Sequence, residues 1–239
     1  MRRVIRSVLR VILRVFFPRI EIAGLERVPA LGPVMLAVNH PNGLIDPLFL
    51  LCLSPRPVSF LAKAPLFHMP VIGWFVKAMG SIPVYRRQDG GFDPAKNRAT
   101  FERARAILSS GGVIAIFPEG ASHGDPKLRP LKTGAARIAL GASSMKGNDH
   151  PLQIVPLGIY YTAKGIFRSS ALLYFGQPIS VHSNNLGEKS RSQFQTHAAG
   201  RRRRGIPCMA GGSVRRRRAK APRAEEAVEK LRWSVQGLV

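Results

Sequence analysis

An imidazole and two carboxylates occupy turn-rich segments of this chain, where packing alone does not require a charge. His40 and Asp46 lie in the segment 39–47, Asn-His-Pro-Asn-Gly-Leu-Ile-Asp-Pro, and Glu119 lies in Phe-Pro-Glu-Gly at 117–120. A carboxylate that bonds one ring nitrogen of a histidine fixes its tautomer and leaves the other nitrogen free to take a proton. The first segment therefore predicts a general base, His40, with Asp46 as its charge partner.

The sequence also allows a purely structural interpretation of this segment. On a regular helix, residues six apart point about 120° away from each other, so His40 and Asp46 meet only if the chain folds back, which Gly43 permits. Asp46 before Pro47 is equally typical of a helix cap followed by proline at the first helical position. A loop histidine often bonds only backbone groups. The residues alone leave both interpretations open.

Basic residues follow the predicted strands near both segments. They are Lys63, Arg86, Arg87, Lys127, Arg129 and Lys132. Arginine forks match phosphate geometry, so a base with cations nearby predicts proton abstraction from a substrate that carries phosphate. Any one of these residues is also compatible with a solvated surface charge, and Glu119 with a turn cap. We expect Lys63, Arg86 and Lys132 among the substrate-binding residues.

Alternating strands and helices must position these groups. The strand candidates are 34–38, 58–61, 82–85, 113–117, 154–160 and 171–175, and segments with helical spacing are 65–79, 93–110 and 133–144. Asp93 before Pro94 is typical of a helix start. This alternation predicts a single α/β domain with a mixed, largely parallel sheet covered by helices. Ligand sites in such folds gather beyond the strand ends, where both acidic segments fall.

Composition limits the setting. With 239 residues, 45% of them hydrophobic, the chain can bury one sizeable core. Its two cysteines, Cys52 and Cys208, lie far apart, which argues against a disulfide framework or a zinc site and fits a reducing compartment. The net charge of +24 implies a polyanionic partner, either an anionic membrane or a nucleic acid.

The N-terminal segment favours the membrane. Arg3, Arg6, Arg10 and Arg14 recur at three- and four-residue steps among apolar residues, so a helix gathers them into one stripe. The apolar runs before Pro18 are too short for a membrane span or a cleavable signal peptide. We expect residues 1–19 to form an amphipathic helix on an anionic phospholipid surface, at the cytoplasmic face, in a peripheral or monotopic protein. The alternative is a helix packed on its own domain.

Four sequence blocks in order resemble the glycerolipid acyltransferase superfamily, the lysophosphatidate and glycerol-3-phosphate acyltransferases. They are Asn39-His40 with Asp46, Gly-Ser-Ile-Pro-Val-Tyr-Arg at 80–86, Phe-Pro-Glu-Gly at 117–120, and Ile-Val-Pro-Leu at 154–157. The resemblance spans about residues 20–179, which we expect to be the catalytic domain. It implies transfer of a fatty acyl group from acyl-CoA or an acyl carrier protein to a glycerophosphate hydroxyl, without a metal or other cofactor. Another lysolipid is the alternative acceptor.

One departure separates this chain from most of the family. Five residues lie between His40 and Asp46, whereas four are usual. The longer form resembles a branch with fungal glycerol-3-phosphate or dihydroxyacetone-phosphate acyltransferases and bacterial relatives. Ser122-His123 and the segment 131–137 also resemble that branch. The spacing is therefore interpreted as a mark of a subgroup, and it leaves the acceptor open.

The resemblance assigns roles to individual positions. It implies that His40 deprotonates the acceptor hydroxyl, that Asp46 is its charge partner, and that Arg86, Glu119 and Gly120 bind the acceptor. Pro156 matches a position on the side of the acyl donor, although a buried proline at a strand end accounts for it equally well.

Other classes of protein fit less well. Residues 119–123 lack the Gly-x-Ser-x-Gly elbow of serine hydrolases. A metal hydrolase using His40, Asp46, Glu119 and His123 would lack a compact ligand motif.

The C-terminal segment has a composition unlike the rest of the chain. The blocks Arg201–Arg204 and Arg215–Arg218 suit nucleic acid, but no basic-aromatic motif accompanies them. Residues 180–239 are predicted to be a basic, disordered tail in which 224–239 form a short helix. Two hypotheses account for it: a tether to anionic membranes, or an altered reading frame.

Overall fold

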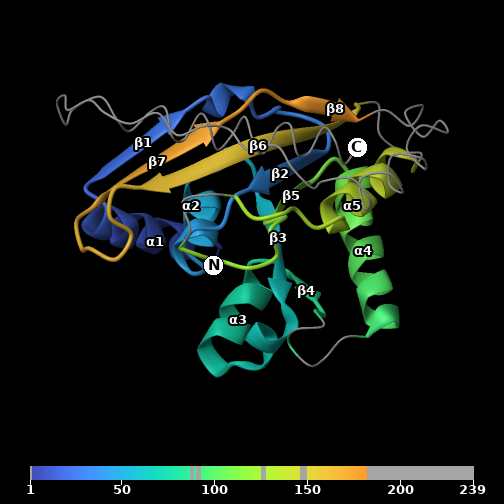
Figure 1. The fold of residues 1–239 in the computed structure, drawn as a ribbon, viewed down its shortest axis with the longest axis horizontal. Helices are drawn as coiled ribbons and strands as arrows, with labels where there is room; N and C mark the ends of the chain where they lie inside the picture. The colour runs from blue at the N-terminus through green and yellow to red at the C-terminus, as the bar shows by residue number, and fades with distance from the viewer. Residues whose placement is uncertain (1, 87–88, 90–92, 125–127, 146–149, 182–239) are drawn as a thin grey trace, which may run out of the picture.

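A mixed sheet, covered by helices on both faces, forms the core of the computed structural model, which describes residues 2–86, 89, 93–124, 128–145 and 150–181 (Figure 1). The order across the sheet is β1-β7-β6-β2-β5-β3-β4, and β8 also pairs with β6. The strands are β1 (Arg19–Ala23), β2 (Val34–Val38), β3 (Val58–Lys63), β4 (Ile82–Val84), β5 (Val113–Ile116), β6 (Leu152–Tyr161), β7 (Ser170–Phe175) and β8 (Ile179–Val181). Only the β6–β7 and β6–β8 pairs are antiparallel among these strands, which confirms a mixed, largely parallel sheet.

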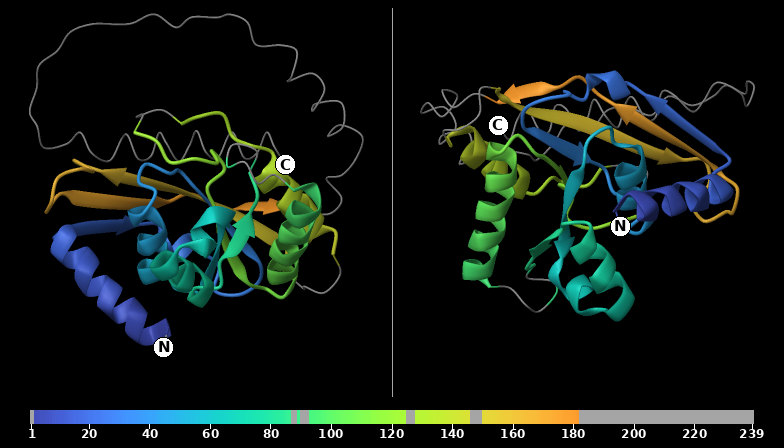
Figure 2. Two further views of the ribbon diagram at one scale, coloured as in Figure 1. Left: turned by 90° about the horizontal axis from the view of Figure 1, so that it is seen from below. Right: turned by 180° about the vertical axis from the view of Figure 1, so that it is seen from behind.

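The helices divide between the two faces of the sheet. They are α1 (Arg2–Phe16), α2 (Ile45–Leu53), α3 (Pro70–Ala78), α4 (Pro94–Ser109) and α5 (Gly134–Ser143), with short 3₁₀ helices η1 (Leu25–Arg27) and η2 (Ala64–His68). One core cluster joins the sheet to α1 and α2, and a second joins it to α4 and α5. Figure 2 shows α3 standing apart, beside β3 and β4.

The central strand β2 explains why the first sequence motif lies where it does. All five of its residues are buried, and it pairs in parallel with β5 on one side and β6 on the other. Val34, Leu36 and Val38 belong to one core cluster and Met35 and Ala37 to the other, because successive side chains of a strand point to opposite faces. The carboxyl ends of β2 and β5 meet at one edge of the sheet, so the segments that follow them are brought together.

One predicted helix is two elements. The segment 65–79 was expected to be a continuous helix, but η2 ends at His68 and α3 begins at Pro70. Met69 between them is extended, with φ −77° and ψ 135°, because a residue before proline is disfavoured in the helical region. The edge strands β1 and β8 were not among the predicted strands.

The N-terminal helix α1 packs one face on the domain. Leu13 and Phe17 are buried in the core cluster that includes α2. Arg10 Nε donates to the carbonyl of Cys52 at 3.0 Å, and Arg6 donates to the carbonyls of Cys52 and Ser54. Two arginines of the predicted stripe thus satisfy carbonyls at the end of α2, which have no partner within that helix.

Several predicted features fall outside the described residues. They include the basic tail after Val181, together with Cys208, Arg87 and Lys127. Within the part of the chain that the structure describes, no helix is both long and apolar enough to cross a membrane.

Candidate active site

The loop from β2 to α2 is held at both ends by asparagine side chains. Asn39 Oδ1 accepts from the backbone N–H of Ile159 at 2.7 Å, and its Nδ2 donates to the carbonyl of the same residue at 3.0 Å. Asn42 Oδ1 accepts from the N–H groups of Leu44 and Ile45 where α2 begins. The interpretation of Asp46 as the helix cap is therefore wrong, because Asn42 supplies the acceptor and Asp46 lies inside the first turn.

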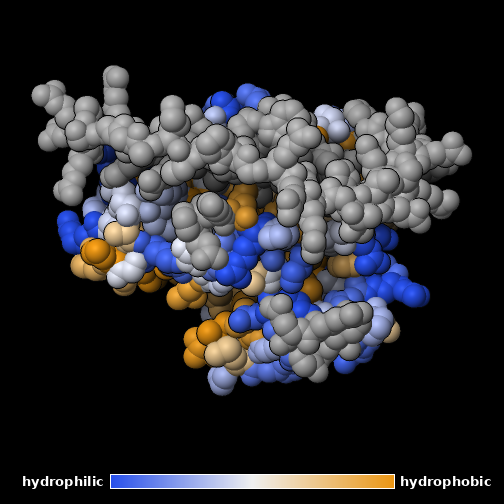
Figure 3. Space-filling view, in the orientation of Figure 1, coloured by the Kyte–Doolittle hydropathy of each residue, from blue (hydrophilic) through white to orange (hydrophobic). Residues whose placement is uncertain are grey.

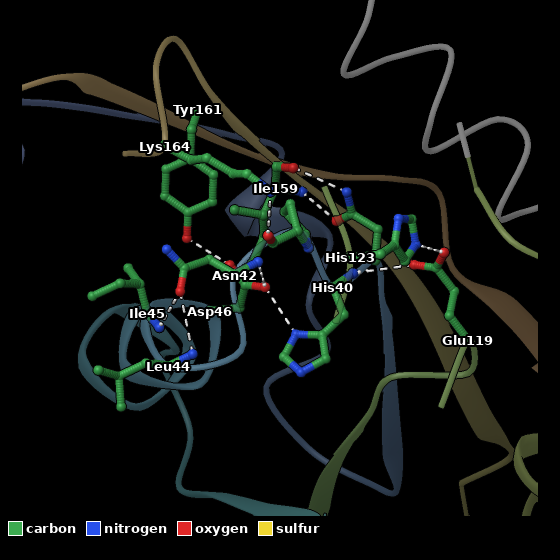
Figure 4. Close-up of polar contacts among 12 residues, drawn as sticks. His40, Asn42, Leu44, Ile45, Asp46, Glu119, His123, Ile159, Tyr161 and Lys164 are labelled. Atoms are coloured by element: carbon green, nitrogen blue, oxygen red, sulfur yellow. Dashed lines mark hydrogen bonds and ion pairs between the residues drawn. The ribbon is translucent and has the colours of Figure 1, made fainter. Parts of the chain in front are cut away.

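His40 and Asp46 are in contact. The chain folds back at the turn, and His40 Nδ1 lies 2.9 Å from Asp46 Oδ2. The Asp46 side chain is fully buried. Its Oδ2 also accepts from the N–H of Asn42 at 2.8 Å, and its Oδ1 accepts from the hydroxyl of Tyr161 at 2.5 Å (Figure 4). Burial, reinforced by the charge of Asp46, raises the pKa of Tyr161 above its ordinary value, so this hydroxyl stays a donor.

The imidazole of His40 is fixed with one nitrogen available. The ring stacks on Phe117, with centroids 3.9 Å apart and planes 18° apart, and it lines a cavity. Because Nδ1 faces a carboxylate, the proton of a neutral ring belongs on Nδ1 and Nε2 keeps its lone pair. Nε2 points away from Asp46 (Figure 4). This arrangement suits a general base that acts on a group in the cavity.

Glu119 lies behind His40 and outside the cavity lining. Its side chain is fully buried; Oε1 accepts from the N–H of His40 at 3.2 Å, and Oε2 accepts from the N–H of Arg129 at 2.8 Å. Oε2 also pairs with the ring nitrogen Nε2 of His123. The backbone N–H of His123 donates to the carbonyl of His40. The family resemblance implies that Glu119 binds the acceptor, and the structure shows its carboxylate bonded to the backbone of His40.

Three cationic side chains meet at one end of the cavity. Arg86 donates from Nε and one terminal nitrogen to both oxygens of Asp89, at 2.7 and 2.8 Å, and from the other terminal nitrogen to the carbonyl of Gly120. These hydrogen bonds, with the charges of Lys63 and Lys132, hold the pKa of Asp89 below its ordinary range. Gly120 has φ +73°, and an added Cβ would meet the Lys132 side chain at 2.7 Å. Only glycine fits there without strain.

The cavity that His40 lines is large and mostly apolar. Its volume is about 700 Å³, and it lies between α2, the β3–η2–α3 segment and residues 116–122. Apolar lining residues include Leu48, Leu51, Phe60, Leu66, Ile72, Phe75, Val76 and Phe101. His40, Lys63, Arg86 and Lys132 line it as well. The cavity therefore suits a ligand with a long apolar part and a phosphate.

The structure thus brings together His40, Asp46, Arg86, Gly120, Lys63 and Lys132 at or beside one cavity. Sequence reasoning missed Tyr161 and Asp89. Tyr161 follows the fourth motif block on β6, and only the position of β6 next to β2 reveals its contact with Asp46. Asp89 was overlooked because nothing in its local sequence distinguishes it from a surface acid.

Comparison with known proteins places this geometry in context. The family model for acyltransferases matches residues 19–160. An uncharacterized acyltransferase of Schizosaccharomyces pombe is 27% identical over 73% of this chain and 38% of its own length. A chloroplastic 1-acyl-sn-glycerol-3-phosphate acyltransferase of Brassica napus is 32% identical over 52% of this chain and 34% of its own. Glycerol-3-phosphate O-acyltransferase 2 of Saccharomyces cerevisiae is 41% identical over 36% of this chain and 11% of its own.

The chain spans about a third of the length of the first two of these relatives. A solved structure with a similar fold is the 1-acyl-sn-glycerophosphate acyltransferase PlsC from Thermotoga maritima. The TM-score is 0.56 at 17% identity, covering 82% of this chain and 78% of that one. At this identity, the likeness shows a shared fold.

Proposed function

The chain belongs to the acyltransferase family, and we propose that it transfers a fatty acyl group from a thioester to a hydroxyl of a glycerophosphate acceptor. The observation that carries the proposal is the contact of His40 with buried Asp46 at the wall of a cavity that is apolar along most of its lining and cationic at one end. Relatives named for 1-acylglycerol-3-phosphate and for glycerol-3-phosphate support this acceptor class.

The proposed reaction uses His40 as its base. His40 Nε2 takes the proton of the acceptor hydroxyl as its oxygen attacks the thioester carbonyl carbon. The new carbon–oxygen bond forms, the carbon–sulfur bond breaks, and the leaving thiolate takes the proton from the imidazolium. Asp46 holds the ring in the required tautomer and stabilises its cationic form during the reaction. No acyl-enzyme intermediate is needed.

The cations at one end of the cavity suit the acceptor phosphate. The planar fork of Arg86, which holds Asp89 in this structure, can bind phosphate oxygens in place of that carboxylate, and Lys63 and Lys132 add positive charge from the same end. The apolar walls suit the acyl chain, because removing apolar surface from water contributes about 25 cal/mol per Å². The acyl donor, acyl-CoA or acyl carrier protein, enters as a co-substrate.

The N-terminal helix is the reason to propose that the protein lies on the membrane surface. Opposite its buried face, α1 exposes Val4, Val8, Val11 and Val15, each at least half exposed. A helix that is apolar on two opposite faces needs an apolar partner on both, and the domain supplies only one. We propose that the outer face enters an anionic phospholipid interface at the cytoplasmic side. Arg6 and Arg10 secure the inner face to α2, a role not predicted from the sequence.

Acyl transfer with a panel of substrates tests the function. The full chain is incubated with palmitoyl-CoA or palmitoyl-acyl carrier protein and with glycerol-3-phosphate, lysophosphatidate or lysophosphatidylcholine. We expect esterification of a phosphate-bearing glycerol acceptor, and the product identifies which one. Preference for lysophosphatidylcholine would instead support another lysolipid as acceptor. Absence of acylation with every pair would refute the proposal.

A further inference from the structure

The helix α3 carries apolar residues on two sides. On one side Ile72, Phe75 and Val76 line the cavity. On the other side Val71 is 78% exposed and Trp74 is 55% exposed, although neither lines the cavity. Met69, just before the helix, is 45% exposed. Figure 3 shows apolar atoms gathered over α3, at the lower end of the molecule.

The segment 60–86, which includes α3, carries charges of one sign. Residues 60–86 contain no acid, and Lys77 on α3 is exposed. Tryptophan favours the boundary between lipid acyl chains and headgroups, where its ring is buried and its N–H is hydrated. Lys77, one turn along α3 from Trp74, can reach phosphate oxygens while its stem covers apolar surface. These features together match a phospholipid bilayer better than the surface of a soluble partner.

We propose that α3 lies in the bilayer interface, with Val71 and Trp74 among the upper acyl chains. The wall of the cavity that α3 forms is then the wall that faces the membrane. Leu44, just before α2, both lines the cavity and is 66% exposed, so the cavity reaches the surface there. The acyl chains of the substrates then pass along α3 from the bilayer to His40 with little exposure to water. This second step rests on the proposed function, whereas the contact with lipid does not.

Trp74 is a natural reporter of this contact. The sequence holds one other tryptophan, Trp233, so the full chain with Trp233→Phe reports on Trp74 alone. Vesicles of equal parts phosphatidylcholine and phosphatidylglycerol should shift its emission to shorter wavelength. Lipids brominated near the headgroup end of the acyl chain should quench it. Unchanged emission while the protein sediments with the vesicles would overturn the proposal, and so would a failure to sediment. A shift that depends on protein concentration without vesicles would show contact between copies instead, and would also overturn it.

A matched pair of variants tests the substrate route. Val71→Lys places a charge in the proposed contact, and Leu31→Lys places one at a site of similar exposure, 73%, before β2 and away from the cavity. We expect Val71→Lys to lower partition into vesicles by about tenfold. It should also raise KM for a bilayer-embedded acceptor and leave the rate with short-chain, monomeric substrates unchanged. Leu31→Lys should match the native chain. Equal partition of the two variants would contradict the proposal.

These measurements separate two possible failures. If no substrate pair is acylated, the proposed function fails, yet the emission of Trp74 still decides whether α3 contacts lipid. If acyl transfer is intact and Trp74 stays in water, only the placement of α3 fails.

Discussion

The hydroxyl of Tyr161 donates to Asp46 Oδ1 at 2.5 Å, across 115 positions of the chain. With His40 and the N–H of Asn42 on Oδ2, both oxygens of this buried carboxylate are held in place. Tyr161 is contributed by β6, the neighbour of β2, so the sheet itself positions the partner of the proposed base. We interpret Tyr161 as a positioning residue that acts through Asp46.

Tyr161→Phe removes this donor and keeps the ring. We expect the free energy of unfolding to fall by about 1 kcal/mol and kcat to fall by about tenfold. KM for both substrates should change little. Because the pKa of Tyr161 is raised, its hydroxyl stays protonated in the native chain, and the ratio of native to variant kcat should hold constant up to about pH 10. Tyr160→Phe, the adjacent change on the opposite face of β6, is the control. Equal effects of the two variants would contradict a positioning role.

The same raised pKa predicts how stability depends on alkaline pH. The tyrosine of the unfolded chain ionises near pH 10, while the folded hydroxyl resists ionisation. The contribution of Tyr161 is therefore complete below that pH and decreases as pH rises above it. Denaturant titrations should show a gap in unfolding free energy between native and Tyr161→Phe chains that narrows at high pH. A gap that widens there would contradict the assignment.

Glu119→Gln should weaken the support of His40 rather than acceptor binding. The amide retains one acceptor oxygen but brings an NH₂ group to a position where Glu119 now accepts from Arg129 or His40. We expect a loss of about 1–3 kcal/mol of unfolding free energy and a lower kcat, with acceptor KM little changed. Glu102→Gln, an exposed change on α4, is the control. Intact stability together with a large rise in acceptor KM would show direct contact between Glu119 and the acceptor.

We expect Asp89 to compete with the acceptor phosphate for Arg86, because Asp89 and Arg86 are bound to each other in this structure. Its pKa is held below the ordinary range, chiefly by the Arg86 hydrogen bonds, so it remains charged at neutral pH. Asp89→Asn should free the guanidinium and lower KM for phosphate-bearing acceptors by about threefold to tenfold. Asp93→Asn makes the same change of charge at the cap of α4, where asparagine serves equally well. A higher acceptor KM in Asp89→Asn would show that Asp89 instead orients Arg86 for binding.

Sequence patterns predicted the parts of the fold that depend on local chemistry. The apolar runs at β2 and β5 are strands, and Asp93 accepts from the N–H groups of Ala95 and Lys96 as a helix cap should. The helix predicted for 65–79 was wrong because apolar spacing continues through the break that Pro70 imposes. The local sequence of Asp46 suited a helix cap as well as a partner of His40. The hydrogen bonds of Asn42 at the start of α2 decide between these two roles.

Contacts between distant segments were beyond the reach of sequence reasoning. The hydroxyl of Tyr161 reaches Asp46 because β6 and β2 are paired, and no local pattern encodes that pairing. The arginines of α1 show the same limit, since spacing identified a stripe but not the carbonyls of α2 that Arg6 and Arg10 bind.

The rate of acyl transfer by His40→Ala decides whether His40 is the base of the reaction. The full chain is assayed with a long-chain acyl-CoA and with glycerol-3-phosphate or lysophosphatidate, beside His68→Ala, which removes an exposed imidazole outside the site. We expect acylation by the native chain and by His68→Ala, and a loss of about 10²–10⁴ in kcat for His40→Ala in a folded protein. A native rate in His40→Ala would contradict this expectation.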